Sequence, residues 1–350
     1  MKKAFILVLL VAALLMVLAA CGGQTTDDPS TATVPTEDAP TPPTTPDTPT
    51  PTLPNLTPPP ASSDDPTSAP EPSVAYITIR GEQFSTSLTE LDLSGMGLQD
   101  EDIEQLRYMT NLVALDLGGT ATVYFSGSLA PLSNLINLRY LGLNSARISD
   151  FSPIANLTNL VVLDLTRAHF NINDLPLLSE LTNLEWLDLS AVSLAGGGQN
   201  RINDISPLSG LSNLTGLRLT NSNVSNLVPL STLSNLTYLN LNHSQVNDLT
   251  PLSGLIQLTE LHLGNSEIIN LTPLSGLPNL QALHLQNNQI SDISPLSGLS
   301  NLEHMSLDNN QISDLTPLSD LSNLERLGLT DNPVTDWSPV AHVRTVWGRP

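Results

Sequence analysis

The stretch NLEHMSLDNNQISDLTPLSDLS, residues 301–322, contains one complete copy of the motif that decides the fold of this chain. The motif begins with the spacing L-x-x-L-x-L, and from Leu214 onward it returns every 22 residues. A unit this short cannot bury its own apolar face, so the copies must stack on one another to form a continuous core. The first leucine of each copy is Leu88, Leu112, Leu138, Leu160, Leu184, Leu214, Leu236, Leu258, Leu280, Leu302 or Leu324.

Each copy predicts a short strand, a turn and a single helical turn. In LTELHLGNS, residues 258–266, the three leucines point inward from a strand and the residues between them face outward, because side chains alternate. The segments DISPL (292–296) and DLTPL (314–318) predict 3₁₀ or single α turns, in which a Ser or Thr hydroxyl caps free amides and proline takes the first helical position. The sequence therefore predicts an α/β solenoid. It is a leucine-rich repeat horseshoe with a parallel β-sheet on the concave side and short turns on the convex side.

The repeat domain is expected to span residues 75–350 and to be closed at both ends. The alternating run from Tyr76 to Ile79 predicts a strand that caps the first repeat. Residues 100–109 predict a helix, because acidic residues come first and apolar residues follow at helical spacing. Val346 falls one full period after the last motif leucine, which indicates a truncated last repeat with the nearby tryptophans closing the core.

Residues 1–20 have the composition of an export signal. Two lysines precede an apolar run, and the run ends in small residues before Cys21, the single cysteine of the chain. The sequence Leu18-Ala19-Ala20-Cys21 resembles the lipobox of bacterial lipoproteins, which implies cleavage before Cys21 and attachment of lipid there. An uncleaved anchor helix is the alternative. Both interpretations place the rest of the chain outside the cytoplasmic membrane and tethered to it.

Residues 21–74 form a different kind of polymer. Proline and threonine dominate residues 40–60, and few apolar residues are present to offset the entropy of ordering by burial. Proline favours extended backbone. We therefore expect a disordered, semi-rigid stalk that begins at the lipidated cysteine and lifts the repeat domain off the membrane.

The charge and residue types of the chain argue against several classes of function. The formal net charge is −22, and no lysine follows Lys3. A basic footprint for nucleic acid is therefore absent. Catalysis lacks support, because the single cysteine is the expected lipid site and the sequence has no serine-elbow, phosphate-loop or paired-carboxylate signature. We expect a protein that is not an enzyme and carries no cofactor.

The 22-residue repeats resemble those of the bacterial internalin family. The resemblance rests on residues 301–322 and their neighbouring copies, and it covers about residues 88–340. It implies a surface protein that binds other macromolecules through its concave face. The family favours asparagine three residues after the last strand leucine, where its amide bonds the backbone of adjacent turns. This chain keeps it at Asn288, Asn310 and Asn332, and serine or apolar residues replace it in earlier repeats, so we expect a looser N-terminal half.

The outward strand positions form columns along the sheet and carry the first candidate site. Gly216 lies between Trp186 and Tyr238 in one column, which predicts a slot with aromatic walls about 10 Å apart. Arg218 lies beside this slot, and the glycine-rich loop at residues 193–204 is positioned to fold over it. Aromatic anchors with arginine are typical of binding hot spots, and flat aromatic walls also suit sugar rings. The predicted ligand-binding residues are Trp186, Gly216, Arg218, Tyr238, Tyr140, Asp188 and Asn240.

Three histidines form the second candidate site. His262 and His284 are adjacent in one column, His304 is diagonal to them, and Glu260 is nearby. Imidazoles beside a carboxylate suit a transition metal, but two histidines in register do not complete a zinc site. We therefore predict no metal site, with these three histidines as the alternative candidates for metal binding or pH sensing.

A series of aspartates precedes the helical turns. Such residues satisfy free backbone amides at the start of a turn, and no aspartate-rich calcium loop is present, so we expect capping and not calcium binding. The series is Asp150, Asp174, Asp204, Asp248, Asp292, Asp314 and Asp336.

These features predict a lipid-anchored protein of the cell surface that holds a protein or glycan ligand on its concave face. A structural envelope component without a specific partner is the first alternative. A metal- or pH-responsive surface protein is the second. Concave-face substitutions distinguish them, because only a binding module loses a partner when its outward aromatic residues are removed.

Overall fold

The computed structural model describes residues 75–119, 128–169, 171–192 and 202–349. The chain divides into two units, Met1–Ala69 and Pro70–Pro350, and the repeats lie in the second. The predicted export signal, the lipid site Cys21, the stalk and most of the glycine-rich loop fall outside the described residues.

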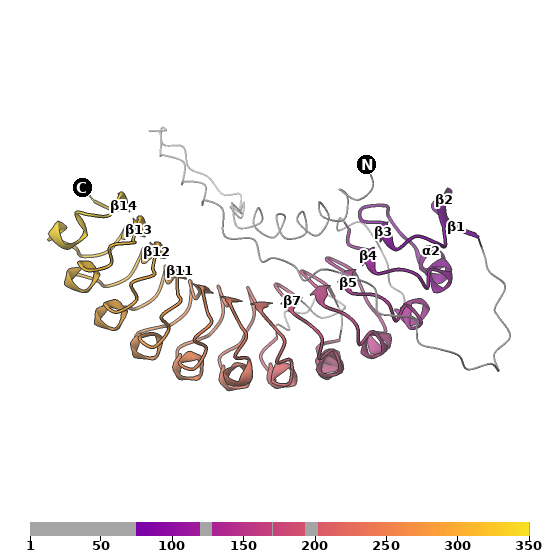
Figure 1. Ribbon diagram of the computed structural model, residues 1–350, viewed down its shortest axis with the longest axis horizontal. Coiled ribbons are helices and arrows are strands. Elements are labelled where there is room, and N and C mark those ends of the chain that lie inside the picture. Colours follow the sequence, from indigo (N-terminus) through magenta and orange to yellow (C-terminus); the bar gives the residue numbers. More distant parts are fainter. Residues whose placement is uncertain (1–74, 120–127, 170, 193–201, 350) are drawn as a thin grey trace, which may run out of the picture. The chain divides into compact units, whose positions relative to one another are not determined.

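Twelve short parallel strands form one sheet along the inner, concave side of the repeat array (Figure 1). Each strand pairs in register with the next, so equivalent positions of successive repeats line up in columns. This confirms the predicted parallel sheet. The strands are β3 (Glu90–Asp92), β4 (Ala114–Asp116), β5 (Tyr140–Gly142), β6 (Val162–Asp164), β7 (Trp186–Asp188), β8 (Gly216–Arg218), β9 (Tyr238–Asn240), β10 (Glu260–His262), β11 (Ala282–His284), β12 (His304–Ser306), β13 (Arg326–Gly328) and β14 (Thr345–Trp347).

Short helical turns line the outer, convex side (Figure 1). The one α-helix in the described part is α2 (Asp100–Glu104), which continues into the 3₁₀ turn η1 (Gln105–Tyr108), as predicted for residues 100–109. The remaining 3₁₀ turns are η2 (Ala130–Leu132), η3 (Ser152–Asn156), η4 (Ile172–Glu180), η5 (Ser206–Leu208), η6 (Val228–Thr232), η7 (Thr250–Leu252), η8 (Thr272–Leu274), η9 (Ser294–Leu296), η10 (Thr316–Leu318) and η11 (Ser338–Val340).

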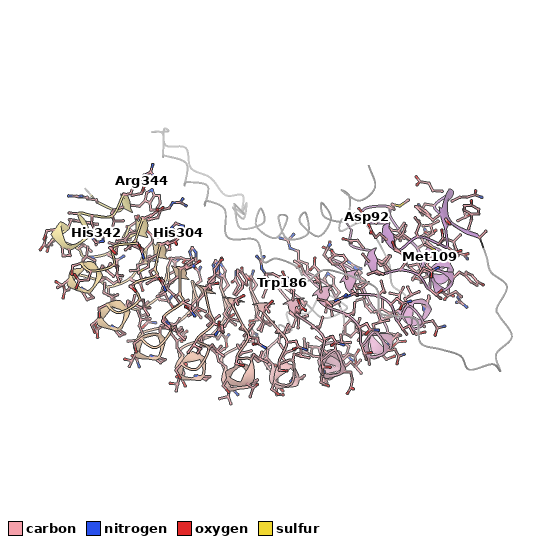
Figure 2. The ribbon with its side chains drawn as sticks, in the orientation of Figure 1. Asp92, Met109, Trp186, His304, His342 and Arg344 are labelled. Carbon is pink, nitrogen blue, oxygen red and sulfur yellow. The ribbon has the colours of Figure 1, made fainter. Side chains whose placement is uncertain are left out.

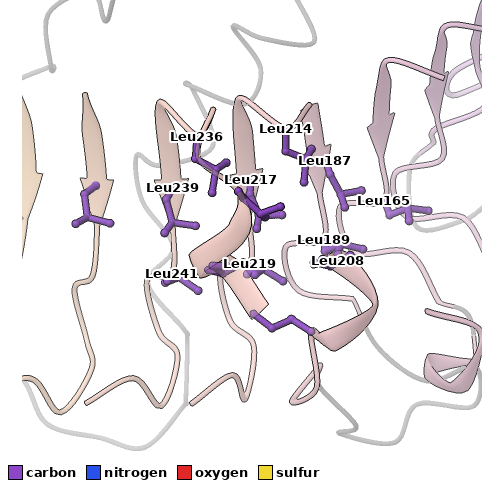
Figure 3. Packing of buried hydrophobic residues seen from close by; sticks show 14 of the residues in the cluster. Leu165, Leu187, Leu189, Leu208, Leu214, Leu217, Leu219, Leu236, Leu239 and Leu241 are labelled. Carbon is purple, nitrogen blue, oxygen red and sulfur yellow. The ribbon is translucent and has the colours of Figure 1, made fainter. Parts of the chain in front are cut away.

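The motif leucines fill the space between the sheet and the turns. In a central repeat Leu214, Leu217 and Leu219 are fully buried, and Leu208 of η5 closes the same layer from the convex side (Figure 3). Fully burying one leucine side chain stabilises the fold by about 1.5–3 kcal/mol. Since each repeat contributes such a layer, the rigid core holds the outward strand positions at fixed spacing.

A hairpin caps the N-terminal end of the array. Strand β1 (Tyr76–Ile79) pairs antiparallel with β2 (Glu82–Ser85), and this pair is separate from the twelve-stranded sheet. Ile77 and Ile79 are buried in the common core. The predicted strand at residues 76–79 is present, and its partner strand was not predicted.

The C-terminal end is a shortened repeat, but its register differs from the prediction. Val346 of β14 pairs with Leu327, and the difference of the two numbers gives a spacing of 19 residues. Placing Val346 one 22-residue period after Leu324 was therefore wrong, because the connection before β14 is shorter than in the regular repeats. Trp337 packs partly buried against the core, as expected.

Aspartate side chains begin most of the convex turns. Asp292 Oδ1 accepts the backbone N–H of Ser294 at 2.8 Å, and hydrogen bonds from the Ser294 hydroxyl and N–H lower the pKa of Asp292. The expected capping by aspartate is thus confirmed here and for Asp150, Asp204, Asp248, Asp314 and Asp336.

Two details of the predicted caps were wrong. The Ser152 hydroxyl donates to Asp150 Oδ1 at 2.6 Å, and the same carboxylate oxygen, not the hydroxyl, accepts the backbone N–H of Ser152. Asp174 lies inside η4, and Asn171 caps that turn by accepting the backbone N–H of Asn173.

A buried asparagine ladder joins the C-terminal repeats. Asn310 Nδ2 donates to the carbonyls of Leu285 and Leu307, and its Oδ1 accepts the N–H of Ile290. Asn288 and Asn332 repeat this arrangement. The predicted contact with adjacent turns is confirmed. In earlier repeats the Ser222 and Ser244 hydroxyls bond each other, and Ser222 Oγ also accepts the N–H of Val224 at 3.4 Å. Ala146 and Ala168 fill this position without polar atoms.

Replacing Ser266 with asparagine is expected to stabilise the fold by about 1–3 kcal/mol. The buried Ser266 hydroxyl has no hydrogen-bond partner, whereas an asparagine there matches Asn288 and would reach the carbonyls of Leu241 and Leu263 and the N–H of Val246. The measurement is the midpoint of urea unfolding. Ser266→Ala serves as control, and an asparagine variant no more stable than this alanine variant would refute the expectation.

A second asparagine ladder runs along the exposed edge of the repeats and was missed in the sequence. In each case the side-chain amide donates to a backbone carbonyl of the preceding repeat, as Asn323 does to Ser300 at 2.9 Å. The signal was visible as an asparagine directly before the first motif leucine. The other members are Asn111, Asn137, Asn159, Asn183, Asn213, Asn235, Asn279 and Asn301.

Candidate functional site

Aromatic and imidazole rings form a connected row on the concave face, where Trp186 and His304 lie (Figure 2). The ring centroids of Trp186 and Tyr238 are 5.3 Å apart, and those of Tyr238 and His262 are 5.5 Å apart. The rings of His262 and His284 are nearly parallel at 4.3 Å. The Arg218 guanidinium lies over the rings of Trp186 and Tyr238. These five residues are called the concave-face row below: Trp186, Arg218, Tyr238, His262 and His284.

The predicted open slot between Trp186 and Tyr238 does not exist. A Cβ atom on Gly216 would lie 2.0 Å from Trp186 Cε3, so the indole occupies the space that a side chain would fill. The aromatic walls are therefore about half as far apart as two strand spacings require. Gly216 serves the row by allowing Trp186 to reach Tyr238, and it does not leave a gap for a ligand.

Gly216→Ala is expected to displace the Trp186 ring, because the new methyl group and the indole cannot share this space. The measurement is the shift of the Trp186 indole N–H resonance. Gly298→Ala is the matched control, since nothing lies within 4 Å of a Cβ at that position. An unchanged indole resonance would show that the ring does not depend on Gly216.

Arg218 and Asp188 hold the row from within the face. The Arg218 guanidinium carbon lies 5.6 Å from the Trp186 ring centroid and 5.0 Å from that of Tyr238. Its Nε is 4.0 Å from Asp188 Oδ2. Burial raises the pKa of Asp188, the charge of Asp164 adds to this, and Arg218 opposes it. Arg218 and Asp188 are only 7% and 1% exposed, so these outward strand positions are packed by their neighbours.

Asn240 supports the row, whereas Tyr140 lies apart from it. Asn240 Nδ2 donates to the Tyr238 hydroxyl at 3.2 Å, and its Oδ1 accepts the N–H of Asn242. Tyr140 is buried on β5 and donates its hydroxyl to Asp116 at 3.2 Å. Burial raises the pKa of both Tyr140 and Asp116. Of the seven predicted ligand-binding residues, the structure therefore brings six together and leaves Tyr140 in a separate acidic group.

Four aspartates in one outward column have a structural role that was not predicted from the sequence. They are Asp92, Asp116, Asp164 and Asp188. Asp116 Oδ1 accepts the N–H of Gly118, and Asp164 Oδ1 accepts that of Thr166. Asp92 and Asp188 do the same for Ser94 and Ser190. These carboxylates thus fix the turn that follows each strand.

Two of the three candidate histidines, His262 and His284, belong to the row. His262 Nε2 lies 2.6 Å from Glu260 Oε1, and His262 stacks on His284. His304 follows on β12, where it pairs in register with Ala282. In the described ranges, no group of three or more His, Cys, Asp or Glu side chains is arranged to hold a metal ion.

Comparison with known proteins places the repeats in a known class. A family model described as leucine-rich repeats (two copies) matches residues 256–298 and 300–342. The crystal structure of an internalin, InlF from Listeria monocytogenes, aligns with a TM-score of 0.64 and 28% sequence identity over 77% of this chain and 91% of its own. The functional domain of InlJ from Listeria monocytogenes aligns with a TM-score of 0.59 and 20% identity over 76% of this chain and 55% of its own. No curated protein sequence matches this chain.

The sheet, the 3₁₀ turns and the matching family model define a leucine-rich repeat solenoid. Proteins of this class generally bind other proteins and are interaction scaffolds, not enzymes. The chain is therefore a leucine-rich repeat protein, and its repeats are similar to those of the internalin InlF. In the part that the structure describes, no helix is long and apolar enough to cross a membrane.

Proposed function

We propose that this chain is anchored at the outer side of a cell membrane and binds a macromolecular ligand on its concave face. The observation that carries this proposal is the concave-face row, in which three ring contacts and one guanidinium join strands β7 to β11. A row of large side chains on a rigid sheet loses little conformational entropy on binding, so it offers a prepared anchor for a partner.

The geometry of the row favours a protein over a glycan as ligand. Sugars stack on open aromatic faces, but here Tyr238 turns its ring to Trp186 on one side and to His262 on the other. Arg218 lies over the Trp186 and Tyr238 rings as well. What remains for a ligand is ring edges and polar atoms, which protein side chains and backbone contact readily.

Anchoring is the second part of the proposal and rests on the sequence. Cleavage before Cys21 and lipid attachment there would leave residues 21–74 as a stalk beneath the repeat domain, residues 75–350. We expect Cys21→Ala to release the protein from the membrane fraction while the repeat fold is retained. Continued sedimentation of this variant with membranes would contradict lipid anchoring at Cys21.

Capture with the full chain tests the binding function. The immobilised chain is offered surface-protein extracts and, separately, an array of envelope glycans, beside the variant Trp186→Ala/Tyr238→Ala. We expect a protein that the parent retains and the variant loses. A glycan retained in this way would overturn the preference for a protein ligand. Capture of nothing, or equal capture by both chains, would overturn the row as the binding site and favour a structural role.

A further inference from the structure

The two stacked histidines connect directly to the far end of the concave-face row. His262 and His284 are register partners on β10 and β11, and their rings lie 4.3 Å apart with an interplanar angle of 6°. His262 contacts Tyr238, which contacts Trp186. A change at the stack can therefore reach the Trp186 indole through successive ring contacts.

His262 has a carboxylate beside it, whereas the neighbours of His284 are mainly other imidazoles. On β10, the Glu260 carboxylate lies 2.6 Å from His262 Nε2, so a positive charge on His262 has a partner. On β12, His304 contributes a second imidazole, and Ser306, the register partner of His284, donates its hydroxyl to Asp308. Strand β9 contributes the uncharged Tyr238 and Asn240.

A proton on His284 is disfavoured in the stacked position. Within the described ranges, no carboxylate lies within ion-pair distance of His284. A charge on His284 would lie in a half-buried site and face two other imidazoles. Two charged rings at the observed separation would repel each other strongly, since stacked rings this close leave no room for water between them.

Burial, followed by the neighbouring His262 and His304, lowers the pKa of His284 from 6.5 to about 3. A ring released into solvent regains the ordinary value. The stacked arrangement is therefore fully favoured above pH 6.5 and loses stability as the pH falls toward 3. Each pH unit below 6.5 favours the released ring about tenfold, so pH 5 favours it about 30-fold more than neutral pH does.

We propose that the His262–His284 stack is a proton-sensitive switch in the concave-face row: acidification to about pH 5 separates the two rings and disturbs the row as far as Trp186. A fall in ligand affinity over the same pH range follows only if the row is the binding site, so that consequence rests on the proposed function. The switch itself requires no ligand and can be tested without one.

Nuclear magnetic resonance of the full chain, labelled at the histidine Cε1 and tryptophan indole positions, tests the switch between pH 8 and pH 5. We expect the Trp186 indole resonance to move together with those of His262 and His284. A Trp186 resonance that stays constant over this range would overturn the proposal. So would a His284 that titrates like an exposed histidine with no change at His262.

Two variants show whether His284 is responsible. His284→Phe keeps a flat ring but cannot take a proton, so the pH response of Trp186 is expected to disappear. His342→Phe, which removes a histidine outside the row that contacts the Leu321 carbonyl, is expected to leave the response unchanged. A Trp186 response that persists in both His284→Phe and His284→Gln would refute the role of His284, whatever the outcome of the capture experiment.

Discussion

Trp186→Ala is expected to weaken ligand binding about 30-fold, and Trp186→Ala/Tyr238→Ala by about a further tenfold or more. Trp186 is the largest side chain of the row and contacts both Tyr238 and Arg218, so its removal deletes contact area and also frees its neighbours. Binding of the captured partner to the immobilised chain measures the effect.

Val162→Ala is the matched control for this prediction. Val162 occupies the same outward strand position as Trp186 on the neighbouring β6, but it lies outside the row. We expect less than about a threefold loss of affinity for this variant. Circular dichroism and urea unfolding establish that each variant keeps its fold. Equal losses for Val162→Ala and Trp186→Ala would show that the row is not a preferred anchor.

Asn310→Ala is expected to destabilise the repeat domain by about 1–3 kcal/mol. The substitution leaves the N–H of Ile290 without its acceptor. It also removes one of two donors from the buried carbonyls of Leu285 and Leu307, which keep the amides of Asn288 and Asn332. Water cannot replace these bonds easily, because Asn310 is only 7% exposed. The measurement is the midpoint of urea unfolding, read separately for the C-terminal repeats by hydrogen exchange, since repeat arrays need not unfold in one step.

Asn323→Ala provides the comparison for the buried ladder. Asn323 also donates to a backbone carbonyl of the preceding repeat, but it is exposed and makes a single such bond. We expect a loss of about 1 kcal/mol or less, because water can take the place of the amide. If the two alanine variants lose the same stability, burial is not what makes the ladder important.

The fold could be predicted because its main determinant is a period. Leucines at fixed spacing specify which residues face the core, and stacking of identical units then specifies a parallel sheet in register. The register of Val346 could not be obtained in this way, because it depends on the length of one irregular connection at the end of the array. The second asparagine ladder was visible in the sequence, but a single exposed polar position per repeat carries no hydrophobic signal.

The candidate site was predicted as a set of residues and not as an arrangement. Strand spacing places Trp186, Gly216 and Tyr238 in one column, but it does not determine how far a flexible indole leans along that column. Because Gly216 has no side chain, the Trp186 indole occupies the space beside it and fills the predicted slot. For the same reason the sequence predicted two separate candidate sites, one at the aromatic residues and one at the histidines. In the structure Tyr238 contacts His262, and His262 stacks on His284, so they form one row.

The measurement that tests the central claim most directly is site-specific photocrosslinking of the captured partner. A photoreactive residue is placed at Ala282, an outward position on β11 in register with Glu260 and His304. A second is placed at Val228, which is exposed at the start of the convex turn η6. We predict crosslinks to the partner from position 282 and none from position 228. Crosslinks from position 228 alone would place the ligand on the convex side and contradict binding at the concave-face row.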